Sequence, residues 1–177
     1  MGKKKGTRGE DKDYPVLIQH GAWGKSDDWT DTFWPFKLSE LGYDVWLGNN
    51  SGNDLTTYKN RGASEYEKWD FNWADMGTKD VPAMIDEILE VTGNEKVTYI
   101  GMSQGNAQMH YGLAKREDDY YQNTLNRFIS LAPCVFDWDR SFDATYEGSM
   151  DFYQKLFDAE IYYSGGKNAR WNNMKVC

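Results

Sequence analysis

The segment GMSQG (101–105) fits the pattern G-x-S-x-G, in which a serine stands between two glycines. A serine hydroxyl becomes a nucleophile for acyl transfer when a neighbouring base takes its proton. The pattern is short enough to occur by chance, so its surroundings decide its meaning. A strand-like run, VTYI (97–100), precedes it and a helix-like run, NAQMHYGLA (106–114), follows it, which is the arrangement that the motif requires. We therefore predict that Ser103 is a nucleophile, rather than a serine in an ordinary loop between a strand and a helix.

The two glycines indicate a strained turn with close neighbours. Gly101 and Gly105 have no side chain, so other backbone segments can pass next to them. We expect a φ angle at Ser103 that is positive or near it, because strained backbone gathers at functional sites. The helix that begins at Gln104 should point its free N–H groups at a reacting carbonyl.

A second motif, HGAWG (20–24), follows the apolar run YPVLIQ (14–19). In hydrolases with a serine elbow of this kind, one oxyanion N–H comes from the loop after an earlier strand, and the other from the residue after the nucleophile. We assign these donors to Ala22 and Gln104. Gly21 and His20 belong to the same loop, and we interpret His20 as a histidine that shapes this loop rather than as a general base.

The order of apolar runs and breakers predicts an α/β fold class. Strand-like runs alternate with helix-like runs, which indicates a mostly parallel sheet flanked by helices. Pro35 interrupts the stretch 27–41, so we expect a loop that enters a short helix there. Pro82 is tolerated only in a first helical turn, so we expect the next helix to begin near Asp80 and to end at Gly93. The expected strands are 14–19, 43–47, 96–100 and 125–131, and a further helix spans 104–114.

Five blocks, in this order, resemble the acid lipase family, which includes gastric and lysosomal acid lipases and their cholesteryl-ester-cleaving relatives. The resemblance implies an α/β-hydrolase fold, with residues 14–135 as the N-terminal part of the core and therefore a truncated sheet. Residues 1–13 are interpreted as a disordered lead, and residues 136–177 as the start of a cap or as a fragment tail. The matching blocks are PVLIQHGAWG (15–24), LGYDVWLGNNSGN (41–53), KWDFNWADMGTKDVPAMID (68–86), VTYIGMSQGNAQ (97–108) and FISLAP (128–133).

The resemblance also implies a function. It implies lipid ester substrates, an acyl-enzyme at Ser103, transient contact with a lipid interface, and neither metal nor cofactor. Family members are typically secreted or lysosomal, yet no secretory signal pattern follows the lysines at the N-terminus. Two alternatives stay open at this point: a serine acyltransferase that uses an alcohol acceptor, and a lipid-binding remnant without catalysis.

The sequence departs from the family pattern at three points. Met102 stands where the family usually has His, and Ser51 stands where it usually has Arg. The family takes its acid and base from later strands, and the only two histidines here are His20 and His110. His110 lies seven residues after Ser103, about 10 Å along a helix, which is beyond the reach of a base. We therefore expect this chain alone to be a very poor enzyme.

Composition excludes several other functions. The formal net charge of −8 argues against nucleic acid as a partner, and no apolar run approaches the length of a membrane span. Two cysteines are too few for a cysteine-rich metal site. Other side chains that could suggest a site are interpreted as structural. Asp27, Asp28 and Asp31 are helix N-terminal charges, 117–119 is a solvated segment, 69–73 packs a helix entrance, and Asp137 and Asp139 are turn formers.

Overall fold

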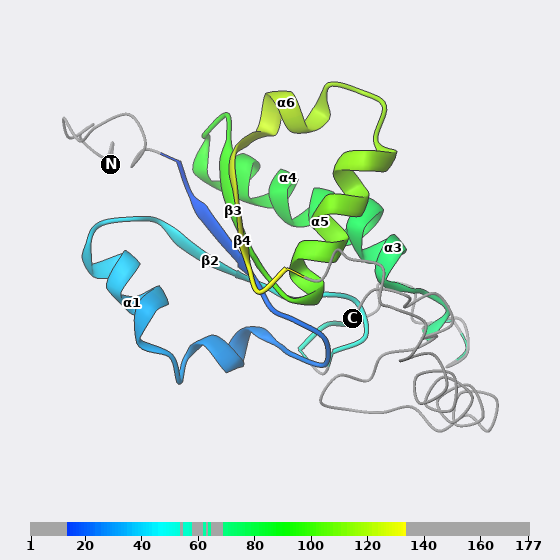
Figure 1. The fold of residues 1–177 in the computed structure, drawn as a ribbon, viewed down its shortest axis with the longest axis horizontal. Coiled ribbons are helices and arrows are strands. Elements are labelled where there is room, and N and C mark those ends of the chain that lie inside the picture. Colours follow the sequence, from blue (N-terminus) through cyan, green and yellow to red (C-terminus); the bar gives the residue numbers. More distant parts are fainter. Residues whose placement is uncertain (1–13, 54, 58–61, 63, 65–68, 134–177) are drawn as a thin grey trace.

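The computed structural model of the chain describes residues 14–53, 55–57, 62, 64 and 69–133 (Figure 1). The expected lead (1–13), the expected cap or tail (136–177), and Asp137 and Asp139 lie outside the described residues.

A four-stranded parallel sheet forms the centre of the fold, as the sequence predicts. Its strands are β1 (Val16–Gln19), β2 (Val45–Gly48), β3 (Val97–Met102) and β4 (Leu125–Leu131). The spatial order is β2-β1-β3-β4, and all three pairings are parallel. Gln19 at the end of β1 pairs with Gly101 near the end of β3, so the loops that follow these two strands start side by side.

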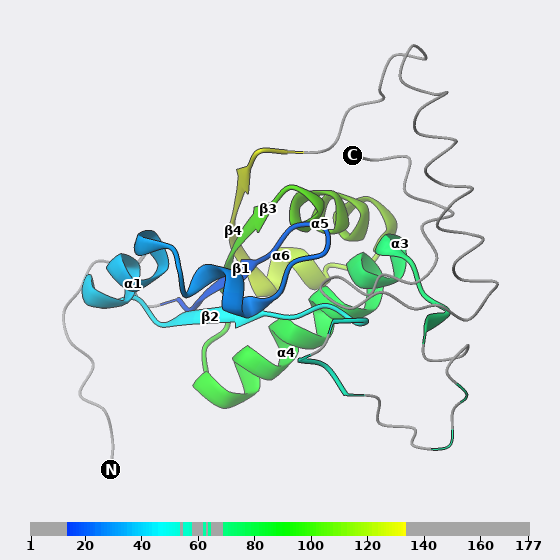
Figure 2. The same cartoon turned by 90° about the horizontal axis from the view of Figure 1, so that it is seen from below.

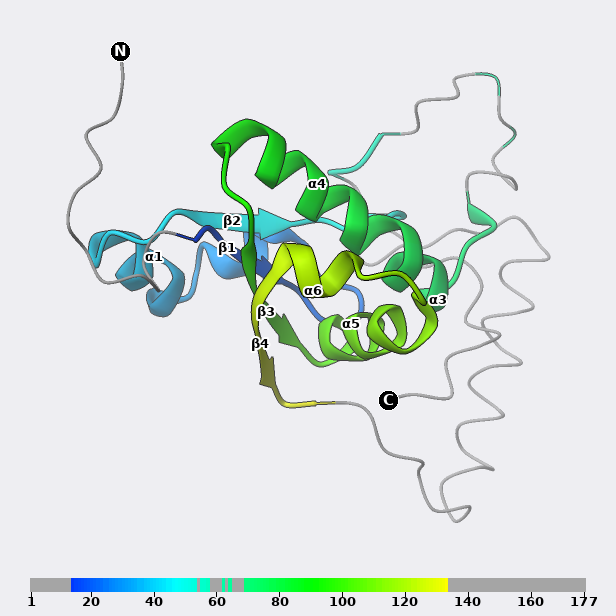
Figure 3. The ribbon, with the colours of Figure 1, turned by 90° about the horizontal axis from the view of Figure 1, so that it is seen from above.

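Apolar side chains cover both faces of this sheet, as expected for parallel strands. Leu17 and Tyr99 belong to one core cluster, together with residues of α4 (Val81–Thr92) and α5 (Gln104–Lys115). Val16 and Ile18 belong to a second cluster that reaches α1 (Phe33–Glu40). Accordingly, α1 lies on one side of the sheet, and α4, α5 and α6 (Tyr120–Thr124) lie on the other (Figure 2, Figure 3).

The connections that follow the neighbouring strands β1 and β3 run to opposite faces of the sheet. The chain leaves β1 toward the face of α1, whereas it leaves β3 directly into α5 on the opposite face. Adjacent parallel strands whose connections diverge in this way leave a crevice outside their carboxyl ends, and α/β proteins bind ligands there. The fold therefore places 20–24 and 101–105 at the point where a site is expected.

The helix before β3 begins where the sequence predicts, and further helical turns precede it. The expectation that it begins near Asp80 is confirmed, because α4 spans Val81–Thr92 with Asp80 at its N-cap and Pro82 in its first turn. A short helix, α3 (Trp73–Asp75), and a π-helical turn, η3 (Met76–Asp80), lead into α4 and were not predicted. Asn72 caps the start: its side chain accepts hydrogen bonds from the N–H groups of Ala74 and Asp75. The wide π turn ends two residues before Pro82, which has no N–H to donate to a preceding turn. The expected end at Gly93 is confirmed, and its φ is 68°.

The remaining short elements agree with the expected loops. Ser26–Trp29 forms a 3₁₀ helix, η2, with Asp27 and Asp28 in its first turn, and α1 carries Pro35 near its start. Residues 117–119 are exposed, as predicted, but they lead into α6, which the sequence did not predict. No helix within the described residues has the length and apolar character needed to cross a membrane.

Candidate active site at the elbow after β3

Ser103 occupies the turn between β3 and α5. Its φ is 51° and its ψ is −117°, a backbone conformation that side-chain-bearing residues rarely adopt. Its N–H donates to the carbonyl of Leu131 (3.1 Å), and its own carbonyl accepts from the N–H of Asn106 (2.9 Å). The turn is thus held from β4 on one side and from the first turn of α5 on the other. This is the strained strand–turn–helix elbow that the sequence predicts.

Strain is concentrated at this end of the sheet. Three non-glycine residues in the described part of the chain have positive φ: Trp23 (59°), Ser103 (51°) and Ala132 (46°). They follow β1, β3 and β4 respectively, at the carboxyl end of each strand. Such conformations cost about 1–3 kcal/mol each and cluster at functional sites. The carboxyl edge of the sheet is therefore where the fold tolerates unfavourable backbone.

Close backbone contact brings the elbow against the loop after β1. A Cβ atom at Gly105 would lie 2.8 Å from the carbonyl oxygen of Gln19 and 2.9 Å from that of His20. A Cβ at Gly21 would lie 3.1 Å from Cβ of Ser103 and 3.6 Å from its Oγ. A Cβ at Gly101 would lie 2.8 Å from the carbonyl oxygen of Gly105. Gly21 and Gly105 are therefore the residues that let the two segments touch, and Gly101 lets the elbow pass close to the start of its own helix.

These contacts place the two expected oxyanion donors beside the nucleophile. Gly24 donates its N–H to the carbonyl of Gly21 (3.3 Å), which closes a turn with Ala22 and Trp23 at its centre. Ala22 directly follows the glycine that meets Ser103, and Gln104 directly follows Ser103 as the first residue of α5. The first N–H groups of a helix have no partner within that helix, so the N–H of Gln104 is suited to donate a hydrogen bond to an anion.

His20 is buried, and both of its ring nitrogens have partners. Nδ1 lies 2.8 Å from the carbonyl of Gly21, and Nε2 lies 3.4 Å from the backbone N of Asn50. A neutral ring that donates from Nδ1 and accepts at Nε2 satisfies both contacts. Burial lowers the pKa of His20, against smaller raising effects of the Gly21 hydrogen bond and of Asp28. The geometry favours the structural interpretation of His20 over a role as base.

His110 does not approach the site as a base would. It is an exposed residue of α5, and its ring packs edge-on against Phe128 of β4, with 4.9 Å between the ring centroids. Neither of the two histidines in the chain is therefore arranged to take a proton from Ser103.

A chain of buried polar contacts, which the sequence analysis did not identify, runs beneath the elbow. Nε2 of Gln108 donates to Oδ1 of Asn50 (3.2 Å) and to the hydroxyl of Tyr99 (3.3 Å). The hydroxyl of Tyr99 donates in turn to the carbonyl of Gly105 (2.8 Å), and burial raises the pKa of this tyrosine, which keeps it protonated. The sequence shows polar residues in the first turns of the helix after the motif, but only the structure shows that they are buried.

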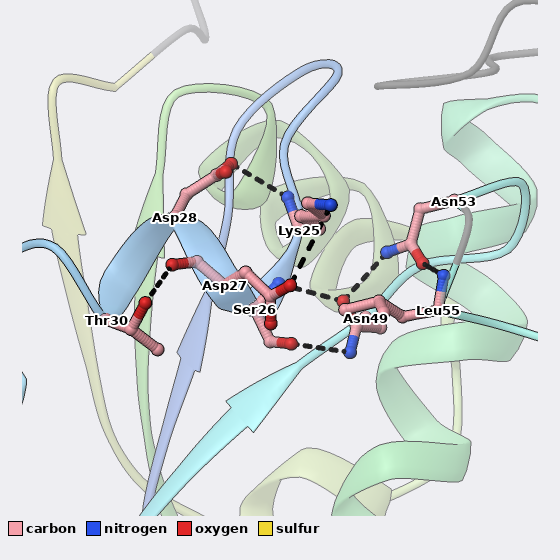
Figure 4. A network of polar contacts seen from close by, with 8 residues as sticks. All are labelled: Lys25, Ser26, Asp27, Asp28, Thr30, Asn49, Asn53 and Leu55. Atoms are coloured by element: carbon pink, nitrogen blue, oxygen red, sulfur yellow. Dashed lines mark hydrogen bonds and ion pairs between the residues drawn. The ribbon is translucent and has the colours of Figure 1, made fainter.

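A second set of polar contacts joins the loops that follow β1 and β2 (Figure 4). The backbone N–H of Ser26 donates to Oδ1 of Asn49 (2.9 Å), and Nδ2 of Asn49 donates to Oγ of Ser26 (3.0 Å). Asn53 donates from Nδ2 to the same Asn49 oxygen (2.8 Å). Asp27 and Asp28, which belong to η2, lie next to these residues, and the Asp28 side chain accepts a hydrogen bond from the N–H of Lys25 (2.9 Å). Both loops are therefore braced against each other next to the elbow.

Ser51, which stands where the resembled family has Arg, contacts a partly buried carboxylate. Its N–H and its hydroxyl both donate to Asp80, at 2.7 and 2.9 Å. Burial raises the pKa of Asp80, and the two Ser51 hydrogen bonds oppose that shift. The loop after β2 is thus attached to the start of α4 without an arginine.

The aromatic segment before α3 packs, as predicted, rather than forming an open pocket. Phe71 and Met76 are buried, and Trp69 and Trp73 pack against them. Trp73 also meets the ring of Tyr111 on α5, with centroids 4.9 Å apart. Nε2 of Gln104 lies 3.1 Å from Sδ of Met76, so this cluster adjoins the residue after the nucleophile.

Other parts of the described structure do not add to the site. A cavity of about 260 Å³ lies between β2 and α4, and no residue of the elbow or of segment 20–24 lines it. Within the described residues, no group of three or more His, Cys, Asp or Glu side chains is arranged to hold a metal ion.

Comparison with known proteins agrees with this geometry. Lipase lipl-3 of Caenorhabditis elegans is 40% identical over 165 residues, which cover 90% of this chain and 39% of that protein. A probable lipase of Schizosaccharomyces pombe is 42% identical over 127 residues (67% of this chain, 28% of that protein). Lipase member M of Mus musculus is 38% identical over 136 residues (74% and 31%). The chain thus spans between a quarter and two fifths of the length of these relatives.

Solved structures and family comparison point to the same fold. A carboxylesterase of the thaumarchaeon Nitrososphaera gargenis superposes with a TM-score of 0.53 at 16% identity, over 85% of this chain and 48% of that one. An extracellular α/β-hydrolase from a Paenibacillus species gives a TM-score of 0.50 at 16% identity, over 83% and 52%. The family described as alpha/beta hydrolase fold matches residues 14–169. This chain, with its parallel sheet and its strained serine elbow, belongs to the α/β-hydrolase fold family.

Proposed function

We propose that this chain carries the nucleophile and the oxyanion hole of a serine hydrolase that cleaves carboxylic esters of lipids. The observation that supports this most is the conformation of Ser103: a non-glycine residue with φ 51° and ψ −117° at the start of a helix, in contact with the loop after the neighbouring strand. Strain of this kind persists only where the surrounding structure enforces it. The lipase names of its relatives support lipid esters as the substrate class.

The reaction follows from the arrangement of the elbow. Oγ of Ser103 bonds to the ester carbonyl carbon as its proton passes to a base, and the carbonyl oxygen becomes an oxyanion held by the N–H groups of Ala22 and Gln104. The bond to the alcohol oxygen then breaks, the alcohol leaves with the proton, and an acyl-enzyme remains. Water adds to the acyl carbon, the carboxylic acid leaves, and Ser103 regains its proton.

The base is the part of this mechanism that neither histidine supplies. His20 is engaged at both ring nitrogens, and His110 lies against Phe128. In a comparable serine hydrolase, removal of the histidine costs about 10⁶-fold in turnover, and the rest of the site retains roughly 10³-fold over water. We therefore expect the chain by itself to hydrolyse a p-nitrophenyl ester barely above background.

Covalent labelling tests the assignment without requiring turnover. The purified chain is incubated with an alkyl fluorophosphonate, and the modified residue is located by mass spectrometry. We expect slow, time-dependent modification at Ser103, which is lost in Ser103→Ala and kept in His110→Ala. A folded chain that stays unmodified at Ser103, or that reacts equally at exposed serines, contradicts the proposal. Ester turnover near that of a complete lipase, abolished by His20→Ala, would instead identify His20 as the base.

A further inference from the structure

Two buried side chains outside the elbow link its helix to the loop after β2. Gln108 is fully buried on α5, and Asn50 is 3% exposed. Fifty-eight positions separate them in the sequence, yet Nε2 of Gln108 donates to Oδ1 of Asn50 at 3.2 Å. Buried side-chain amides of this kind cost stability unless they are hydrogen-bonded, so their partners decide what they hold in place.

On one side this pair leads to the loop that carries Ala22. The backbone N–H of Asn50 points to Nε2 of His20 (3.4 Å), and Nδ1 of the same ring contacts the carbonyl of Gly21 (2.8 Å). The position of Asn50 therefore orients the imidazole, and the imidazole orients the peptide group between Gly21 and Ala22. That peptide group carries the N–H proposed as the first oxyanion donor.

On the other side the pair leads to the elbow. Nε2 of Gln108 also contacts the hydroxyl of Tyr99 (3.3 Å), and this hydroxyl donates to the carbonyl of Gly105 (2.8 Å). Gly105 directly follows Gln104, whose N–H is the second proposed donor. Gly105 in turn packs against the carbonyl oxygens of Gln19 and His20, so this series of contacts returns to the loop after β1.

We propose that Asn50 and Gln108 are positioning residues that set the spacing between the two oxyanion donors, Ala22 and Gln104. This inference rests on the proposed hydrolase function for its catalytic consequence, but its structural part stands on the contacts alone. The two donors belong to loops after different strands, so only a tertiary link can fix their separation. A displacement of about 1 Å at a reacting centre costs about 10²-fold in rate, so a link that fixes the separation of the two donors affects the rate strongly.

The test is the double substitution Asn50→Leu and Gln108→Met in the full chain. Both replacements keep similar volume and remove both partners together, so neither amide is left unpaired and the fold is retained. The matched control is Thr98→Val with Asn126→Leu, which removes another hydrogen bond between side chains (3.1 Å) across β3 and β4, away from the elbow. Asn50→Leu alone is a second variant: like the double variant it keeps the Asn50 backbone N–H for His20, and it leaves Gln108 bonded to Tyr99.

Amide hydrogen exchange and labelling kinetics give separate readouts. We expect the N–H groups of segment 20–24 to exchange at least about tenfold faster in the double variant than in the control, with the amides of β1 and β3 unchanged. We also expect the maximal rate of fluorophosphonate labelling at Ser103 to fall about tenfold or more while the half-saturating probe concentration stays the same, since the donors act on the transition state.

The outcomes separate the two ideas. Exchange in 20–24 that matches the control overturns the positioning role, whatever the labelling shows. Faster exchange in a chain whose unsubstituted form never labels supports the positioning role and counts against the hydrolase proposal. If the half-saturating probe concentration rises while the maximal labelling rate is unchanged, the positioning role is also overturned, because this result would indicate a lost substrate contact.

Discussion

Replacing Gly105 by Ala tests whether the elbow and the loop after β1 are in rigid contact. The new Cβ would lie 2.8 and 2.9 Å from two backbone carbonyl oxygens, those of Gln19 and His20. These oxygens belong to the end of β1, so they cannot rotate away as a side chain could. Overpacking of this kind costs about 1–3 kcal/mol, and the helix propensity of Ala returns about 1 kcal/mol. Because backbone atoms must shift, the overpacking cost lies in the upper part of that range, about 2–3 kcal/mol, and the net loss is about 1–2 kcal/mol. This corresponds to roughly 2–8 °C in Tm for a chain of this size.

The control for this prediction is Gly93→Ala, which is matched in stability but remote from the site. Gly93 has φ 68° and nothing within 4 Å of a Cβ placed there. Its cost is the left-handed conformation alone, about 1–2 kcal/mol, or roughly 2–8 °C. Thermal melting by circular dichroism should show both losses. Fluorophosphonate labelling of Ser103 should slow only in the Gly105 variant, because only there is segment 19–20 displaced. A Gly105→Ala chain that melts and labels like the unsubstituted chain would refute the close-contact argument.

Three further predictions concern the elbow and two titratable groups, the buried His20 and the partly buried Asp80. Ser103→Gly should raise the free energy of unfolding by about 1–3 kcal/mol, because glycine adopts the conformation at φ 51° without strain. Ser103→Ala should abolish labelling without this gain in stability. Equal stability of the two variants would argue against backbone strain at this position. The pKa of His20 is lowered in the folded chain, so the unfolded chain binds more protons as pH falls. The contribution of neutral His20 to the free energy of unfolding should therefore be fully present above about pH 6.5 and be lost as pH drops below it. Urea unfolding at pH 7.5 and 5.5 should show this loss, and a His20→Gln variant should lose less; equal losses would exclude the histidine as their source. Ser51→Ala removes one of two hydrogen bonds to the Asp80 carboxylate and should cost about 1.5–3 kcal/mol at neutral pH. Since the pKa of Asp80 is raised, this cost should shrink as pH falls through that pKa and the carboxyl becomes neutral; a cost that is constant between pH 7.5 and 4 would show that charge plays no part.

Elements whose signals are local could be predicted from the amino-acid sequence. Apolar runs bounded by Gly, Pro and Asn identified the strands. The signal is strongest for β1 and β3, because strands buried on both faces need continuous apolar stretches, whereas β4 is mostly exposed. The glycines around Ser103 identified the elbow, because a turn of that shape requires small neighbours whatever lies around it. The end of α4 at Gly93 was equally local, since a left-handed residue there favours glycine. The expected strain at Ser103 belongs to the same class of inference.

The contacts that hold the loops together could not be predicted, because they join residues far apart in the sequence. Asn50 and Gln108 meet across fifty-eight positions of sequence, and Ser51 meets Asp80 across twenty-nine. Nothing in either local pattern distinguishes a side chain with such a partner from one in solvent. The helical turns that precede α4, from Trp73 to Asp80, also depended on context, because the π turn packs against α5 and no apolar periodicity predicts it. A local pattern can place a nucleophile on its turn, but the separation of two donors on different loops is a property of packing between distant segments, and that exists only in the folded chain.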